Sequence, residues 1–225
     1  MSHQPRNSGL ASDRSESGAG DSPSWRSETF MSPTAQVVAW LVLVALAVAG
    51  RAWQPAAHVT PLAGVSLLSG VIFPNLIVAA SVPLVATMIG NSFLPGYGSV
   101  ALAVVVYAAL AWPVLLGHLG ILGRPDRGPR WLAIIGGALA NSLVFFFATN
   151  TAHWLLTDQY PRTGTGLVAC LVAGLPFHRW MPVGDVAWAL ALFGCLAAAS
   201  SIGSRLFRAR LVAAPVRRGR GDASA

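Results

Sequence analysis

Long apolar runs, separated by short polar breaks, make up most of the hydrophobic pattern of the chain. No Asp, Glu, Lys or Arg lies between Arg51 and Arg124, a gap of 72 residues. Shorter uncharged gaps of 22, 27 and 19 residues run from Glu28 to Arg51, from Arg130 to Asp158 and from Asp185 to Arg205. A membrane-spanning helix needs about 20 mainly apolar residues, so each shorter gap holds one span and the long gap holds three. The pattern predicts an all-α, polytopic membrane protein with about six transmembrane helices.

Proline, glycine and asparagine mark the breaks inside the long gap. Pro74-Asn75 separates two apolar segments, and "NSFLPGYG" at 91–98 forms a loop before the next one. The second and third helices are short for full spans, which favours helices that are tilted or kinked around a tight turn. The expected helices cover about 35–51, 59–73, 76–90, 98–118, 131–156 and 184–205.

The placement of arginine decides how segment 160–183 is interpreted. With six spans and a cytoplasmic N-terminus, twelve arginines fall on the cytoplasmic side and three on the other side. If Gly164–Phe177 also crossed the membrane, seven arginines would lie on the cytoplasmic side and eight on the other side. The cytoplasmic excess that basic residues normally show would then be lost. We therefore expect residues 160–183 to form an external re-entrant or interfacial helix between the last two spans. Both termini are then cytoplasmic.

Composition sets the domain boundaries. Only 10% of the residues are charged, whereas soluble domains carry roughly a quarter. The predicted organisation is a disordered polar tail over 1–32, a transmembrane helical domain over 33–206 and a basic disordered tail over 207–225. A basic tail directly after a transmembrane helix favours contact with anionic lipid headgroups over binding of nucleic acid.

Polar residues interrupt the apolar helix predicted over 131–156. Ser142, Phe146, Thr149 and His153 share one helix face, and Asn150 lies beside it. Two interpretations stay open: these groups hydrogen-bond to neighbouring helices, or they line a cavity that binds a small solute. The candidate substrate-binding residues are Asn91, Asn141, Ser142, Thr149, Asn150, His153, Trp154, Tyr160, Arg162 and Thr163.

Some of these candidates have a plainer interpretation at the end of the helix. Trp154 and Tyr160 fit the aromatic belt that membrane proteins place at the interface whatever their function. Arg162 is either an exposed anchor or a group that attracts an anionic solute.

Motifs for catalysis and metal binding are absent. The sequence contains no HExxH, GxSxG, P-loop or GxGxxG, so we expect no enzymatic activity, no catalytic residue and no cofactor. His58 and His118 have no partner in sequence that would make a metal site. Asp185 follows Gly184 and precedes an apolar run, which predicts an N-cap of the last helix. The predicted spans hold essentially no carboxylate, which weighs against a proton-coupled pump. Active transport would then draw its energy from a separate ATP-binding subunit.

Three stretches resemble an uncharacterised family of bacterial integral membrane proteins. The family has a T-P-[IL]-A element, an S-L-x-F-F-x-x-T-N element and a Y-P-x-T-x-x-G-L-x-x-C…P-F…G-D block. The resemblance covers most of 59–194, leaves both tails outside, and implies a place in the bacterial cytoplasmic membrane. In one departure, Gly90-Asn91 stands where the family commonly has Ser-Asp, which removes a carboxylate. The matching stretches are "VTPLAGVSLLSGVIFPNLIVAASVPLVATMIGN" at 59–91, "NSLVFFFATNTAHWL" at 141–155 and "YPRTGTGLVACLVAGLPFHRWMPVGDVAWALALFG" at 160–194.

That family is in turn similar to the S components of energy-coupling-factor (ECF) vitamin importers, small six-helix proteins that capture a vitamin and dock on a shared energising module. Pro176-Phe177 and Gly184-Asp185 are similar to residues of biotin-type S components. The resemblance implies a coupling transmembrane subunit and ATPases as partners, docked through Ala35-xxx-Ala39 or Ala45-xxx-Ala49. The leading hypothesis is a membrane subunit that binds a small, vitamin-like solute. The alternative is a non-transporting scaffold or assembly protein whose polar cluster only packs helices.

Overall fold

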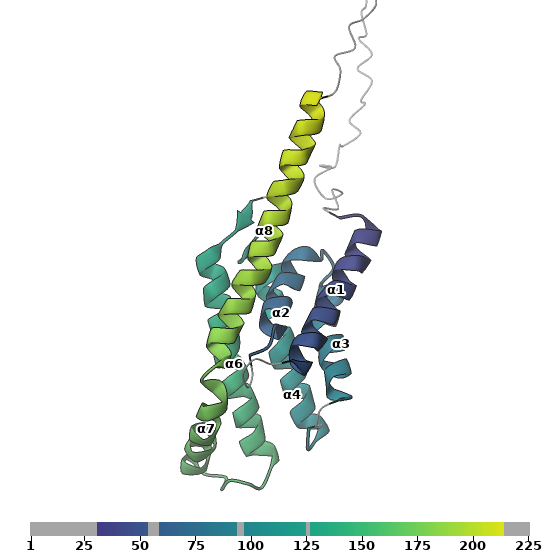
Figure 1. Cartoon of the computed structure of the whole chain (residues 1–225). Coiled ribbons are helices and arrows are strands. Elements are labelled where there is room, and N and C mark those ends of the chain that lie inside the picture. The colour runs from purple at the N-terminus through teal and green to yellow at the C-terminus, as the bar shows by residue number, and fades with distance from the viewer. Residues whose placement is uncertain (1–30, 54–58, 94–96, 125–126, 214–225) are drawn as a thin grey trace, which may run out of the picture. The chain divides into compact units, whose positions relative to one another are not determined.

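Helices form nearly all of the fold, as the apolar pattern predicts. The computed structural model describes residues 31–53, 59–93, 97–124 and 127–213, with side chains described as far as residue 202. The first helices in chain order (Figure 1) are α1 (Pro33–Ala52), α2 (Leu62–Ile72), α3 (Leu76–Asn91), α4 (Val100–Ala111) and α5 (Pro113–His118). A short hairpin with two residues in each strand follows, and after it come α6 (Trp131–Leu156), α7 (Gly164–His178) and α8 (Met181–Ala213). The hairpin pairs β1 (Gly123–Arg124) antiparallel with β2 (Gly128–Pro129).

Side-chain caps explain where several helices begin. Ser32, Asn75, Ser99 and Thr163 each precede a helix, and the side-chain oxygen of each accepts a hydrogen bond from a backbone N–H of the first turn. Such caps satisfy donors that the helix itself leaves without a partner. The expected helix over 98–118 divides into α4 and α5 at Pro113, because proline has no N–H to continue the hydrogen-bond ladder.

Four helical segments are long and apolar enough to cross a membrane. They are α1, the combined segment Val100–His118, α6 and residues 181–202 of α8. The remaining apolar helices α2, α3 and α7 have 11, 16 and 15 residues. At about 1.5 Å per residue, none of them alone reaches the ~30 Å of a hydrocarbon core. The number of six spans therefore stays a prediction.

The short helix α2 forms the centre of the described bundle. Every residue from 61 to 70 is buried, and α2 contacts α1, α3, α5, α6 and α8 (Figure 1). Small residues allow these close contacts: a side chain at Gly70 would clash with the α5 backbone at Val114, and one at Gly64 would lie 3.0 Å from the backbone nitrogen of Ala189 in α8. Close approach through small residues is how helices associate within lipid.

Apolar side chains also cover the outside of the bundle, while several polar ones lie within it. Exposed large hydrophobic residues include Val38 and Leu41 on α1, Leu143 on α6 and Val172 on α7. The buried polar residues are Ser66, Ser69, Thr87, Asn141, Ser142 and Asp185. This distribution is compatible with a protein whose outer surface meets lipid and whose polar groups must find partners inside.

The ends of the last two helices can be compared with the predicted segments, while the domain boundaries themselves stay a prediction. The helix expected within 160–183 is α7, and its position relative to the membrane stays a prediction. The last helix begins at Met181, three residues before the expected start, and continues to Ala213, past the predicted boundary at 206. The N-terminal tail up to residue 30 and residues 214–225 lie outside the described residues.

Candidate functional site

A buried carboxylate joins α6 to α8. Asp185 is 2% exposed and lies in the second turn of α8. Its Oδ2 accepts a 2.7 Å hydrogen bond from the hydroxyl of Ser142 and a 3.0 Å bond from the side-chain amide of Asn141. The prediction that Asp185 caps the last helix is therefore wrong, because α8 starts one turn earlier and turns this side chain toward α6. We call Asp185, Asn141 and Ser142 the carboxylate cluster.

One polar atom of the carboxylate cluster has no partner. The Oδ1 of Asn141 is buried without a hydrogen bond, although the amide nitrogen of the same side chain donates to Asp185. A buried carbonyl oxygen without a partner costs roughly 1–3 kcal/mol. The cluster is thus a polar centre with unused hydrogen-bonding capacity.

A small cavity lies between α6, α7 and the start of α8. Its volume is about 140 Å³, and its lining residues are Phe145, Phe146, Thr149, Asn150, Gly174, Phe177, His178 and Met181. Gly174 leaves room for the Asn150 side chain, since a Cβ there would lie 2.9 Å from the Cγ of Asn150. We call this space the α6–α7 cavity.

His178 supplies the titratable group of the α6–α7 cavity. Its ring packs on Phe146 with centroids 4.6 Å apart, and its Nδ1 is buried without a hydrogen-bond partner. Burial lowers the pKa of the His178 imidazole from its ordinary value, which favours the neutral ring. A neutral imidazole offers both a donor and an acceptor, so this residue can recognise an uncharged polar group.

Hydrogen bonds within the segment 153–163 hold the turn that follows α6. The Nε2 of His153 lies 2.8 Å from the Gln159 side-chain oxygen, and the Trp154 indole donates to the Pro161 carbonyl at 2.8 Å. The Arg162 guanidinium donates to the backbone carbonyl of Trp154 and lies 3.6 Å from the carboxylate of Asp158. Tyr160 places its ring edge-to-face with His153, and Thr163 caps α7. These predicted site residues therefore shape the entry into α7.

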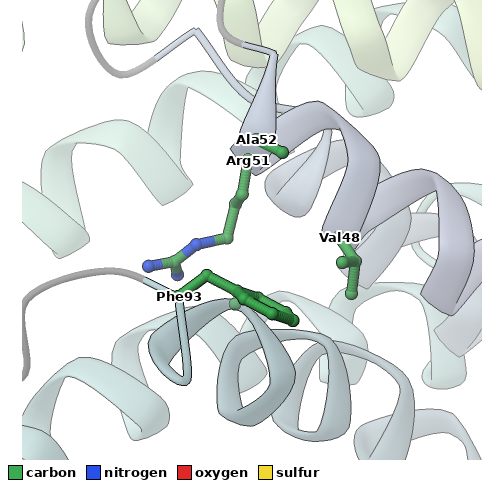
Figure 2. Close-up of a pocket in the computed structure, with 5 residues that line it drawn as sticks. Val48, Arg51, Ala52 and Phe93 are labelled. Atoms are coloured by element: carbon green, nitrogen blue, oxygen red, sulfur yellow. The ribbon is translucent and has the colours of Figure 1, made fainter.

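A separate series of side-chain hydrogen bonds connects α1, α3 and α4. Arg51 donates a 3.0 Å hydrogen bond to the Asn91 side-chain oxygen, and the Asn91 amide donates to the Tyr107 hydroxyl at 3.1 Å. Beside it lies a cavity of about 280 Å³ lined by Val48, Arg51, Ala52, Gly90 and Phe93. Figure 2 shows the Arg51 side chain extending from α1 toward Phe93, which follows α3, with Val48 on the same helix as Arg51. Asn91 thus takes part in a separate cluster from the residues of α6.

The ten predicted site residues divide among four places. Asn141 and Ser142 belong to the carboxylate cluster, Thr149 and Asn150 line the α6–α7 cavity, and Asn91 contacts Arg51. The remaining five, His153, Trp154, Tyr160, Arg162 and Thr163, lie in or beside the turn before α7.

Sequence reasoning missed the partners of the predicted residues. Asp185 and His178 come from helices other than α6, and Arg51 comes from a helix other than the one that carries Asn91. No spacing along the chain connects these partners. The signal available for Asp185 was apolar residues on both sides of a single acid, in "MPVGDVAWALALF". Such a pattern places a carboxylate inside a helix as readily as at its start.

Apolar helices around buried polar clusters support an integral membrane protein of the all-α class. The chain belongs to the family of unknown function DUF6580, whose model matches residues 31–206. The matched segment covers almost all of the helical domain and leaves most of both tails outside. No curated protein and no solved structure matches the chain.

Proposed function

We propose that the protein is a membrane subunit that binds a small, uncharged polar solute in the α6–α7 cavity. The observation that supports this proposal is the composition of the cavity wall. Phe145, Phe146 and Phe177 supply aromatic surface, while Asn150 and His178 supply hydrogen-bonding groups. Apolar surface with a few convergent polar groups is the usual make-up of a small-molecule site.

The size of the α6–α7 cavity limits the solute. Ligand pockets usually enclose about 300–1,000 Å³, whereas this cavity encloses about 140 Å³. It therefore suits a small planar molecule, or one ring of a larger, vitamin-like molecule that also displaces side chains. The neutral imidazole of His178 and the Asn150 amide favour a ring that carries both hydrogen-bond donors and acceptors over an anion.

The orientation in this proposal follows from the excess of arginine on the predicted cytoplasmic side, and the partners follow from the resemblance to S components. The protein lies in the bacterial cytoplasmic membrane with both termini in the cytoplasm, so the C-terminal end of α6 and the cavity face outward. A coupling transmembrane subunit with its ATPases docks on α1. Ala45 and Ala49 are exposed on that helix, whereas Ala35 and Ala39 are partly buried, which favours the former pair as the docking face.

Native mass spectrometry of the purified full-length protein tests solute binding. We expect wild-type protein to retain a small molecule and Thr149→Phe to lose it, because the larger side chain fills the cavity. Leu143→Phe is the matched control, since Leu143 is 52% exposed on the same helix and the change leaves the cavity open. Equal retention by both variants, or wild-type protein without any bound molecule, would count against the proposal.

The scaffold function remains the second candidate, and one observation favours it. Thr149 and Asn150 each donate a hydrogen bond to a backbone carbonyl one turn earlier in α6, and His153 contacts Gln159. Hydrogen bonds within the protein reduce what these side chains can offer a solute. If the protein is only a scaffold, Asn150→Ala and His153→Ala lower its melting temperature in detergent without changing uptake of any solute.

A further inference from the structure

The carboxylate of Asp185 lies where an uncompensated charge is very costly. It is 2% exposed, within the segment of α8 that is long and apolar enough to cross a membrane. Removing a carboxylate from water costs several kcal/mol even after the surroundings relax. An ionisable side chain at such a place points to function when its counter-charge is not supplied by the protein.

The described helices around Asp185 supply no positive charge to it. Both of its hydrogen-bond donors, Asn141 and Ser142, are neutral. The titratable groups on the packed elements are His153 on α6, Cys170 and His178 on α7, and Cys195 on α8, while α2 carries none. The arginines of α8 at 205, 208 and 210 lie about five turns or more further along that helix from Asp185. Among the described residues, none of these groups forms an ion pair or hydrogen bond with the Asp185 carboxylate. Among the described residues the compensation is therefore left to a small cation taken from outside the protein.

The geometry of the hydrogen bonds indicates which cation fits. Both donors reach the same oxygen, Oδ2 of Asp185, and among the described residues no donor reaches Oδ1. The buried Oδ1 of Asn141 needs a donor, and it shares its carbon with the nitrogen that already bonds to Asp185. A proton on Oδ1 of Asp185 supplies that donor and completes a two-point pair between a carboxylic acid and an amide. This one proton neutralises the Asp185 carboxylate and also gives the unpartnered oxygen of Asn141 a hydrogen-bond donor.

We propose that Asp185 is a proton-binding site within the membrane domain, held by Asn141 and Ser142, and that its protonation controls the packing of α8 on α6. A proton taken from water forms the O–H bond on Oδ1, and its release returns a carboxylate. The protonated form joins the two helices through three hydrogen bonds. The carboxylate form leaves a buried negative charge and leaves Oδ1 of Asn141 without a donor, which weakens the same contact. The site is independent of solute binding in the α6–α7 cavity.

Labelling with dicyclohexylcarbodiimide tests this proposal on the purified full-length protein. The reagent partitions into apolar surroundings and reacts with protonated carboxyl groups, and peptide mass spectrometry locates the adduct. We expect an adduct on Asp185 that falls by about tenfold or more from acidic to alkaline pH, because the protonated fraction falls tenfold per pH unit above the titration point. Asp185→Asn gives no adduct at this position.

The pH dependence of thermal unfolding gives a second readout. The wild-type melting temperature falls as the pH rises, since release of the proton leaves a buried charge, and Asp185→Asn loses this part of the dependence. All other titratable groups are the same in both proteins and cancel in the comparison. Asp158→Asn, which changes a fully exposed carboxylate, keeps the wild-type profile and serves as the control. If Asp185→Asn fails to fold, the pH dependence of wild-type labelling decides.

Two results would overturn the proposal. One is the absence of an adduct at Asp185 together with the same pH profile in wild type and Asp185→Asn. The other is a wild-type melting temperature that is higher in NaCl than in choline chloride at equal ionic strength, while the melting temperature of Asp185→Asn is the same in both salts. The cation that compensates the carboxylate would then be sodium and not a proton.

Discussion

Replacing Gly70 with alanine is expected to prevent α2 from packing against α5. A Cβ at this position would clash with the carbonyl oxygen of Val114 and would lie 2.9 Å from its carbonyl carbon and 3.0 Å from the backbone nitrogen of His118. These are backbone atoms of a helix, so the whole of α5 must move. Overpacking in a core costs about 1–3 kcal/mol and sometimes more, and a backbone clash at the centre of the bundle places this variant at about 3 kcal/mol or more. Thermal unfolding in detergent, with the yield of monodisperse protein, measures the effect.

Gly136→Ala is the matched control for this prediction. Gly136 is exposed on α6, and a Cβ there meets nothing within 4 Å. An alanine in the interior of a helix is more favourable than glycine by roughly 0.5–1 kcal/mol, so we expect an unchanged or slightly higher melting temperature. Unfolding of Gly70→Ala at the wild-type temperature would contradict the close α2–α5 contact.

Asn141→Leu is expected to be strongly destabilising, and Asp185→Leu as well. The first change leaves the Asp185 carboxylate with only the Ser142 hydroxyl, and the second leaves two buried donors without an acceptor. A buried polar group that loses its partner costs about 1–3 kcal/mol, and more when it is charged. Replacing both partners is less damaging than the two single changes suggest, because only the Ser142 hydroxyl then lacks its partner.

A double-mutant cycle measures how strongly the effects of the Asn141 and Asp185 substitutions on stability depend on each other. We expect the double variant Asn141→Leu/Asp185→Leu to be more stable than the sum of the single effects predicts, with a coupling energy of about 0.5–3 kcal/mol. Asn75→Leu is a control on an unrelated polar residue, since Asn75 only caps α3, and it should be additive with Asp185→Leu. Additive effects of Asn141→Leu and Asp185→Leu would mean that α6 and α8 are not joined through this contact.

The positions of the helices could be predicted from the apolar pattern and its proline and glycine breaks. Six expected helices and the additional helix within 160–183 correspond to described helices, with α4 and α5 together covering the range 98–118. The ends of the six differ by at most three residues, except that α8 continues eight residues past the expected end at 205. The break at Pro113 was missed, because "YAALAWPVLLGHL" is apolar throughout and only the absent proline N–H divides it. Whether α2 and α3 each cross the membrane depends on tilt and packing, which composition does not contain.

The candidate site was predictable only on the helix that carries most of it. The polar residues of α6 stand out against an apolar background, and two of them line the α6–α7 cavity. Their partners could not be found, since His178 and Asp185 approach α6 only through the folding of α7 and α8. The error on Asp185 also weakens the sequence-based argument against a proton-coupled pump. The spans were expected to lack carboxylates, whereas the central contact between α6 and α8 contains one.

An experimental structure of the protein purified from its native membrane tests the central claim of solute binding most directly. We predict discrete non-protein density in the α6–α7 cavity, within hydrogen-bonding distance of the Asn150 amide and the His178 ring and stacked on Phe146 or Phe177. A cavity closed by its own side chains, or filled by a lipid acyl chain that makes no polar contact, would contradict solute binding and leave helix packing as the role of these residues.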